Sequence, residues 1–252
     1  MSRERTAPVL LIHGALCDAS IWQPQVSVLR RAGWAVCAPT LRGFNAPRPM
    51  ATTITSDSHI DQLAELLVCL GRPAHVVGHS RGGRLALHLA ADFPDLVESL
   101  VLAEPGGARE QGFLPDELPS SPPPLFPSAR VSNSDREALA REYIVAGHGE
   151  EAWAQLSPLF RKAALRNVQT LRFTVPDRSR PLARPVARRI RCATSIIIGD
   201  ASPPLFLQIG RALEEEIPGG RLMILEGADH FAPTNKPSAF NAVMQSFLDE
   251  RS

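Results

Sequence analysis

The sequence predicts an α/β fold, in which one mostly parallel sheet of about six strands is flanked by helices. Short apolar runs alternate with segments whose apolar residues recur every three or four positions, as in buried strands and amphipathic helices. The runs expected to form strands are residues 9–12, 34–38, 74–77, 100–103, 193–198 and 221–225. The segments expected to form helices are residues 21–32, 57–70, 81–91, 204–217 and 237–250.

The alternation of strands and helices stops after the fourth strand. Residues 106–180 contain proline-rich stretches and two expected helices, at 134–146 and 150–171. Because the alternation resumes afterwards, we interpret residues 106–180 as a helical cap inserted into a core domain made of residues 1–105 and 181–252. The arginine-rich run at 184–191 is expected to be a solvated connector that precedes the fifth strand.

The composition indicates one domain with a sizeable core. The chain has 252 residues, of which 44% are hydrophobic, and its formal net charge is +1. This length suits a single α/β domain, and the small charge gives no electrostatic basis for binding nucleic acid or an anionic membrane. No apolar run reaches membrane-spanning length, and the N-terminal residues lack the apolar core of a signal peptide.

The cysteines and histidines show no spacing that is typical of a metal site. The four cysteines are scattered along the chain, without the pattern of a disulfide framework. We therefore expect reduced thiols in a cytoplasmic protein that needs neither a metal nor another cofactor. The oligomeric state stays open, with a homodimer as one alternative.

The most informative motif is Gly-x-Ser-x-Gly, at residues 78–82. A buried apolar run precedes it and a helical pattern follows it, which is the context of a strained strand-to-helix turn that exposes a serine. Gly78 and Gly82 suit such a turn because its backbone needs small neighbours. We interpret Ser80 as a nucleophile, rather than as an incidental serine in a glycine-rich turn.

Three features together resemble the α/β-hydrolase fold: His13-Gly14 after the first strand, the serine motif, and His230 after the last strand. The resemblance covers residues 8–250. Two features depart from the family pattern. Too few residues precede Val9 for the usual N-terminal antiparallel hairpin. In addition, Ser202 stands where the family's usual acid follows the penultimate strand.

The resemblance implies a catalytic triad whose acid is Glu104. In lactone hydrolases of the zearalenone-lactonase type and one group of haloalkane dehalogenases, the acid is a glutamate after the strand that follows the serine helix, which matches Glu104 here. The alternative acid is Asp200, one residue after Gly199. Asp229 is badly placed because it is adjacent to His230 in sequence. We expect Glu104 to accept a hydrogen bond from His230 at an ordinary hydrogen-bond distance.

Serine needs a base within hydrogen-bond reach, and the base needs an orienting carboxylate. We assign these roles to Ser80, His230 and Glu104. The backbone N–H groups of Ala15 and Arg81 are expected to form the oxyanion hole. The side chain of Arg81 is expected to be solvated or salt-bridged rather than to reach the pocket. His13 and His79 are neighbours of the functional residues within their motifs, whereas His75 and His88 are expected to be structural rather than ligands.

The cap is expected to supply the substrate pocket. Apolar side chains dominate it, so we expect an uncharged, apolar ester or lactone as substrate. Ordinary cap packing accounts for most of these side chains equally well. The candidate lining residues are Phe113, Leu114, Leu125, Phe126, Trp153, Leu156, Leu159 and Phe160.

The sequence thus predicts a serine hydrolase that cleaves carboxylic esters through an acyl-enzyme on Ser80, with lactones as the narrower hypothesis. One alternative is C–C bond hydrolysis, or a lyase or cyclase reaction, on the same scaffold. Another alternative, from a different functional class, is a ligand-binding protein that keeps the hydrolase fold without catalysis.

Overall fold

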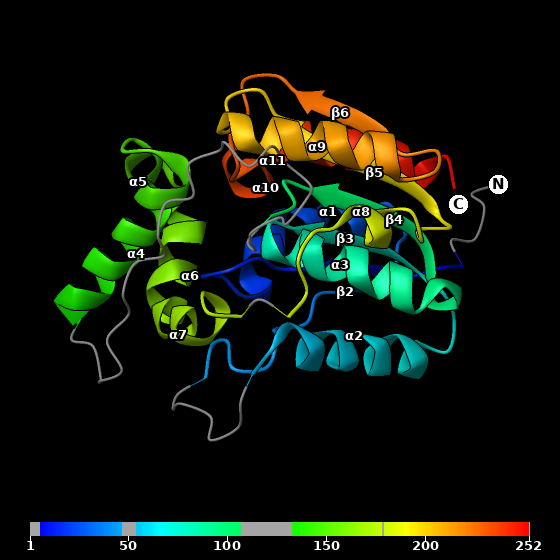
Figure 1. Cartoon of the computed structure of the whole chain (residues 1–252), viewed down its shortest axis with the longest axis horizontal. Helices are drawn as coiled ribbons and strands as arrows, with labels where there is room; N and C mark the ends of the chain where they lie inside the picture. The colour runs from blue at the N-terminus through cyan, green and yellow to red at the C-terminus, as the bar shows by residue number, and fades with distance from the viewer. Residues whose placement is uncertain (1–5, 47–53, 107–132, 178, 252) are drawn as a thin grey trace.

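A computed structural model of the protein describes residues 6–46, 54–106, 133–177 and 179–251. Its described strands form one six-stranded sheet in the order β2-β1-β3-β4-β5-β6, and every neighbouring pair is parallel (Figure 1). This confirms the expected parallel sheet. Residues 6–8, which precede β1, form no strand. The strands are β1 (Val9–Ile12), β2 (Val36–Cys37), β3 (Ala74–His79), β4 (Val97–Ala103), β5 (Ala193–Gly199) and β6 (Arg221–Leu225).

Helices cover both faces of the sheet and bury two apolar clusters. Successive side chains of a strand point to opposite faces, so Val9 and Leu11 of β1 join one cluster while Leu10 joins the other. The first cluster contains residues of α1 and α11, and the second contains residues of α2, α3, α8 and α9. The helices of the core are α1 (Gln23–Arg31), α2 (Ser56–Leu70), α3 (Arg81–Asp92), α8 (Arg184–Ala187), α9 (Pro204–Glu216), the short α10 (Ala232–Asn235) and α11 (Pro237–Asp249). The core also contains the 3₁₀ turns η1 (Ala19–Trp22) and η2 (Pro94–Leu96).

The insertion after β4 is helical, as expected, and its described helices are grouped at the end of the molecule opposite the two chain termini (Figure 1). The helix expected over 150–171 is instead broken. Pro158 lacks an N–H and disfavours helical backbone at Ser157, whose hydroxyl caps a new helix by accepting from Phe160 N at 3.2 Å. The cap elements are α4 (Asn133–His148), α5 (Ala152–Gln155), α6 (Pro158–Asn167), η3 (Val168–Thr170) and α7 (Leu171–Thr174).

Two other expectations need correction. The edge strand expected over 34–38 pairs only at Val36–Cys37. The arginine-rich run is not merely a solvated connector, because it begins with the short helix α8 and pairs with the core. Arg184 and Arg188 form ion pairs with Glu216, and Arg189 pairs with Asp92.

The described residues contain no helix that is both long and apolar enough to cross a membrane. Within those same residues, His, Cys, Asp and Glu side chains form no group suited to hold a metal ion.

Candidate active site

The serine motif forms a strained turn between β3 and α3. Ser80 has φ 55° and ψ −121°, a conformation that is costly for a residue with a side chain. The two glycines permit this turn. A Cβ atom at Gly78 would lie 2.3 Å from the Gly82 carbonyl oxygen, and one at Gly82 would lie 2.3 Å from the Ile12 carbonyl oxygen. No larger residue fits at either position, so the motif is required by backbone packing around the serine.

The loop after β1 lies against Ser80. A Cβ atom at Gly14 would lie 3.1 Å from the Ser80 Cβ. His13 shapes this loop, because its Nδ1–H donates to the Gly14 oxygen at 2.9 Å and its Nε2 accepts from Leu41 N at 3.0 Å. Burial lowers the pKa of His13 to about 4, so the ring is neutral. Ala15, which follows, is half-buried, and Arg81 N lies at the first position of α3.

Glu104 directly follows β4, one strand away from Ser80. Ala103 is in register with His79, and Ser80 N donates to the Ala103 oxygen at 2.9 Å, so Glu104 and Ser80 leave neighbouring strands at the same level. The Glu104 side chain is 2% exposed. Its Oε1 accepts from Gly199 N at 2.5 Å and from Ser202 Oγ at 2.8 Å. Burial nevertheless raises the pKa of Glu104 to about 7.

The ring of His230 faces the other oxygen of this carboxyl group. Its Nδ1 lies 3.5 Å from Glu104 Oε2, which is longer than the expected hydrogen bond, and neither atom has a hydrogen-bond partner among the described residues. The His230 carbonyl accepts from His79 Nε2 at 2.8 Å, which fastens the loop of His230 to the residue before Ser80. Burial and His79 hold the pKa of His230 well below its usual value.

The two competing carboxylates bond elsewhere. Asp200 is exposed, and its Oδ1 accepts from Gly227 N at 2.7 Å. Asp229 accepts from Phe231 N at 3.0 Å and from Asn235 Nδ2 at 2.8 Å, so it supports the turn into α10. Ser202, at the position of the family's usual acid, donates to Glu104 instead of replacing it.

The guanidinium of Arg81 is buried rather than solvated. Its side chain is 2% exposed, and its Nη2 donates to Ser56 Oγ at 3.3 Å and His59 Nδ1 at 3.0 Å. Asp177 Oδ2 lies 3.5 Å from the same nitrogen and also accepts from Ser56 N at 2.7 Å. This cluster joins the serine turn, the start of α2 and the chain leaving the cap, so of our two expectations for Arg81 the salt-bridged one holds.

The two histidines expected to be structural, His75 and His88, both have structural contacts. His75 Nδ1 lies 2.8 Å from Ser99 Oγ, between adjacent strands. His88 Nε2 donates to the Pro181 oxygen at 2.9 Å and so fastens α3 to the segment after the cap.

Three of the four described pocket candidates pack together in one apolar cluster of the cap and core. Trp153, Leu156 and Phe160 are buried there, and the Phe160 ring lies 4.8 Å from that of Phe231, next to His230. Leu159 is half-buried. The other four candidates lie outside the described residues, namely Phe113, Leu114, Leu125 and Phe126.

Sequence reasoning missed three rings that surround His230. Phe206 of α9 lies 4.3 Å from its ring centroid, Phe231 lies 5.2 Å away, and His148 of α4 stacks on it at 4.2 Å. Gly149, with φ +94°, signals that α4 ends at His148. No local pattern indicates that this end of the helix touches His230, because the contact joins the cap to the core.

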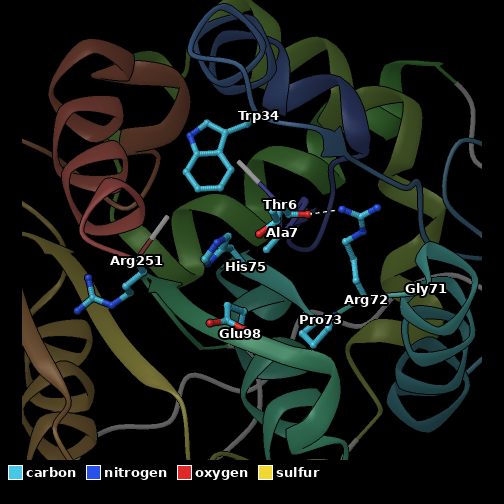
Figure 2. Close-up of a pocket in the computed structure, with 9 residues that line it drawn as sticks. All are labelled: Thr6, Ala7, Trp34, Gly71, Arg72, Pro73, His75, Glu98 and Arg251. Atoms are coloured by element: carbon cyan, nitrogen blue, oxygen red, sulfur yellow. Dashed lines mark hydrogen bonds between the residues drawn. The ribbon is translucent and has the colours of Figure 1, made fainter. Parts of the chain in front are cut away.

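A cavity of about 450 Å³ lies away from this site, at the amino ends of the strands (Figure 2). Ala7 and Pro73 directly precede β1 and β3, whereas Ser80 and Glu104 follow the carboxyl ends of β3 and β4. Ligands of open parallel sheets bind at the carboxyl ends. In Figure 2, Arg72 donates to the Thr6 oxygen, at 2.6 Å, across one side of this cavity. The cavity is therefore not the candidate active site.

The fold and the site together define the class of protein. A strained serine between a parallel strand and a helix, with a histidine–carboxylate pair at the same edge of the sheet, is the arrangement of α/β hydrolases. The model of the alpha/beta hydrolase family matches residues 9–243, and the chain belongs to this family.

Individual relatives agree with this assignment. The chain is 30% identical to the lipase LipV of Mycobacterium tuberculosis, over 97% of this chain and 94% of that protein. Its fold is similar to that of an esterase from Exiguobacterium antarcticum, with a TM-score of 0.74 and 18% identity over 97% of this chain and 92% of that one. A carboxylesterase structure from Nitrososphaera gargenis has a TM-score of 0.72 and 22% identity, over 99% of this chain and 92% of that one.

Proposed function

We propose that this α/β hydrolase cleaves carboxylic esters through an acyl-enzyme on Ser80. The observation that carries the proposal is the approach of His230 Nδ1 to Glu104 Oε2, at 3.5 Å, on loops that are fastened to the strained serine turn. A histidine whose Nδ1–H faces a carboxylate keeps its Nε2 free to act as a base. The strain at Ser80 also supports a reactive rather than a purely structural serine.

In the proposed reaction, the Ser80 oxygen attacks the ester carbonyl carbon while its proton passes to Nε2 of His230. The negative oxygen that forms accepts hydrogen bonds from the backbone N–H groups of Ala15 and Arg81. His230 then gives the proton to the alcohol oxygen, the C–O bond breaks, and the acyl group stays on Ser80. Water, deprotonated by His230, releases the acid and restores the serine.

Glu104, rather than Asp200, is the proposed acid of the triad. Its carboxyl group faces the ring of His230, while the Asp200 carboxylate is exposed and bonded to Gly227 N. The backbone and hydroxyl donors on Oε1 hold the carboxyl plane, so Oε2 stays directed to the histidine. This arrangement supports the kinship with lactone hydrolases of the zearalenone-lactonase type that the sequence implies.

The proposed substrate is a small, apolar ester, with lactones as the narrower hypothesis. Apolar residues of the cap, including Phe160, pack beside the site, which suits an uncharged acyl group. The names of the relatives, a lipase, an esterase and a carboxylesterase, agree with ester chemistry.

The function is tested by a fluorophosphonate probe together with a substrate panel. A serine hydrolase is covalently labelled on Ser80, which peptide mass spectrometry locates, whereas a non-catalytic binder stays unlabelled. The panel contains p-nitrophenyl esters, simple lactones, macrolactones and a β-diketone. Cleavage of the diketone in preference to every ester would mean that the protein hydrolyses C–C bonds, and the proposal of ester hydrolysis would be wrong.

The activity should fall as the pH decreases through about 7. Burial raises the pKa of Glu104 to about 7, so the carboxyl group gains a proton below that pH. A proton on Oε2 would point at Nδ1 of His230 and favour the tautomer whose Nε2 carries the hydrogen, which is not a base. We expect kcat/KM to decrease about tenfold for each pH unit below this value, and to be level above it. A flat profile between pH 5.5 and 8 would contradict the proposed role of a buried, ionised Glu104.

Substrate preference should depend on the cap. Trp153 and Phe160 are buried rings of the same apolar cluster, and Phe160 lies beside Phe231, so replacing either with alanine enlarges the space for the acyl group. We expect the ratio of kcat/KM values for bulky and short acyl esters to change by about tenfold or more, with a small activated ester still cleaved. Equal ratios in both variants and the wild type would mean that these side chains only pack the cap.

A further inference from the structure

The last residue of cap helix α4, His148, packs directly on the ring of His230. The two ring centroids are 4.2 Å apart, and the planes are inclined by 29°. Phe206 contacts both rings, at 4.3 Å from His230 and 5.6 Å from His148. The ring of His230 is therefore held by one aromatic side chain from the cap and another from the core.

The contact between the two histidines is made by their faces and not by a hydrogen bond. Nδ1 of His148 is buried and has no hydrogen-bond partner among the described residues, and the same is true of Nδ1 of His230. The other polar groups facing His230 are His79, with ring centroids 5.0 Å apart, and Glu104. Burial, together with the neighbouring His230 and His79, lowers the pKa of His148, so its ring is neutral.

We propose that His148 is a positioning residue for His230: the face of its ring holds the His230 ring toward Glu104 and stabilises the imidazolium that forms during acyl transfer. This inference rests on the proposed function, because it assigns His230 as the base. It also implies that the cap is part of the catalytic arrangement, since His148 is carried by the insertion and not by the sheet.

The physical reason is the positive charge that His230 gains when it takes the proton of Ser80. A cation is attracted to the face of a neutral aromatic ring, and the attraction is stronger where water is excluded. Glu104 approaches the edge of the His230 ring, at Nδ1, while His148 covers a face. The two neighbours therefore stabilise the same charge from different directions. The stacked ring also limits rotation of His230 away from Ser80.

Two replacements of similar size separate this role from simple packing. His148→Phe keeps an aromatic face, whereas His148→Leu keeps only apolar volume. We expect His148→Leu to lower kcat about tenfold with little change in KM, and His148→Phe to stay within about threefold of the wild type. His148→Met serves as a second non-aromatic variant if the leucine protein does not fold. Thermal unfolding of each variant separates a loss of stability from a loss of turnover.

A spectroscopic measurement tests the same point without substrate. The proton on His230 Nδ1 should give a downfield imidazole N–H signal in the proton NMR spectrum, because it faces Glu104. This signal should persist in His148→Phe and broaden or disappear in His148→Leu.

Equal turnover and an unchanged signal in the leucine variant would overturn the inference, as would an equal loss in the phenylalanine and leucine variants. A different result would show that the proposed ester hydrolysis itself is wrong. In that case the wild-type protein neither reacts with the fluorophosphonate at Ser80 nor cleaves any ester of the panel.

Discussion

Replacing Ser80 with alanine is expected to abolish ester hydrolysis while leaving the fold intact. Alanine keeps the Cβ atom that fits the strained turn and removes only the nucleophilic oxygen. In another enzyme with such a triad, loss of the serine lowers turnover by about 10⁶-fold, so a simple p-nitrophenyl ester assay should detect the change. Circular dichroism and thermal unfolding should match the wild-type protein.

A matched variant tests whether Ser80 and His230 act as one unit. His230→Ala should lose nearly as much activity as Ser80→Ala, and the double variant should lose no more than either single one. Additive losses would mean that the two residues do not share one step. A well-folded Ser80→Ala protein with wild-type turnover would refute the assignment of the nucleophile.

Replacing Glu104 with glutamine is expected to lower turnover by about 10⁴-fold, the loss seen when the acid of another triad becomes an amide. Gly199 N and Ser202 Oγ both donate to Oε1, so the amide oxygen must take that position. The amide nitrogen then faces Nδ1 of His230 and donates a hydrogen to it. The hydrogen of the imidazole is forced onto Nε2, and the ring can no longer accept the proton of Ser80.

Asp200→Asn is the control for this prediction. Asp200 is exposed and accepts from Gly227 N, and an asparagine oxygen can accept the same hydrogen bond. Its turnover should therefore stay within about threefold of the wild type, as expected for a surface substitution. A crippled Asp200→Asn protein beside an active Glu104→Gln protein would reverse the assignment of the acid, and with it the proposed kinship to the lactone hydrolases.

The tertiary contacts explain why the sequence alone did not decide which carboxylate is the acid of the triad. Glu104 and Asp200 both follow strands of the sheet, and either choice keeps the order serine, acid, histidine along the chain that this fold requires. Local sequence contains no information on which carboxyl group faces His230, since the residues are far apart in the chain. In the structure, parallel pairing of β4 with β5 brings Glu104 beside Gly199 and Ser202, and their donors orient its carboxyl group toward His230.

The sequence by itself determined the sheet, the insertion and the strained serine turn, because these depend on local periodicity and on glycines that the backbone requires. Gly78 and Gly82 are examples, since a single added Cβ atom would clash with neighbouring backbone. Only the tertiary structure decided which side chains surround His230. The contact of His148 with that ring arises where the insertion folds back on the sheet. Packing between segments distant in sequence sets such contacts, and no local pattern encodes them.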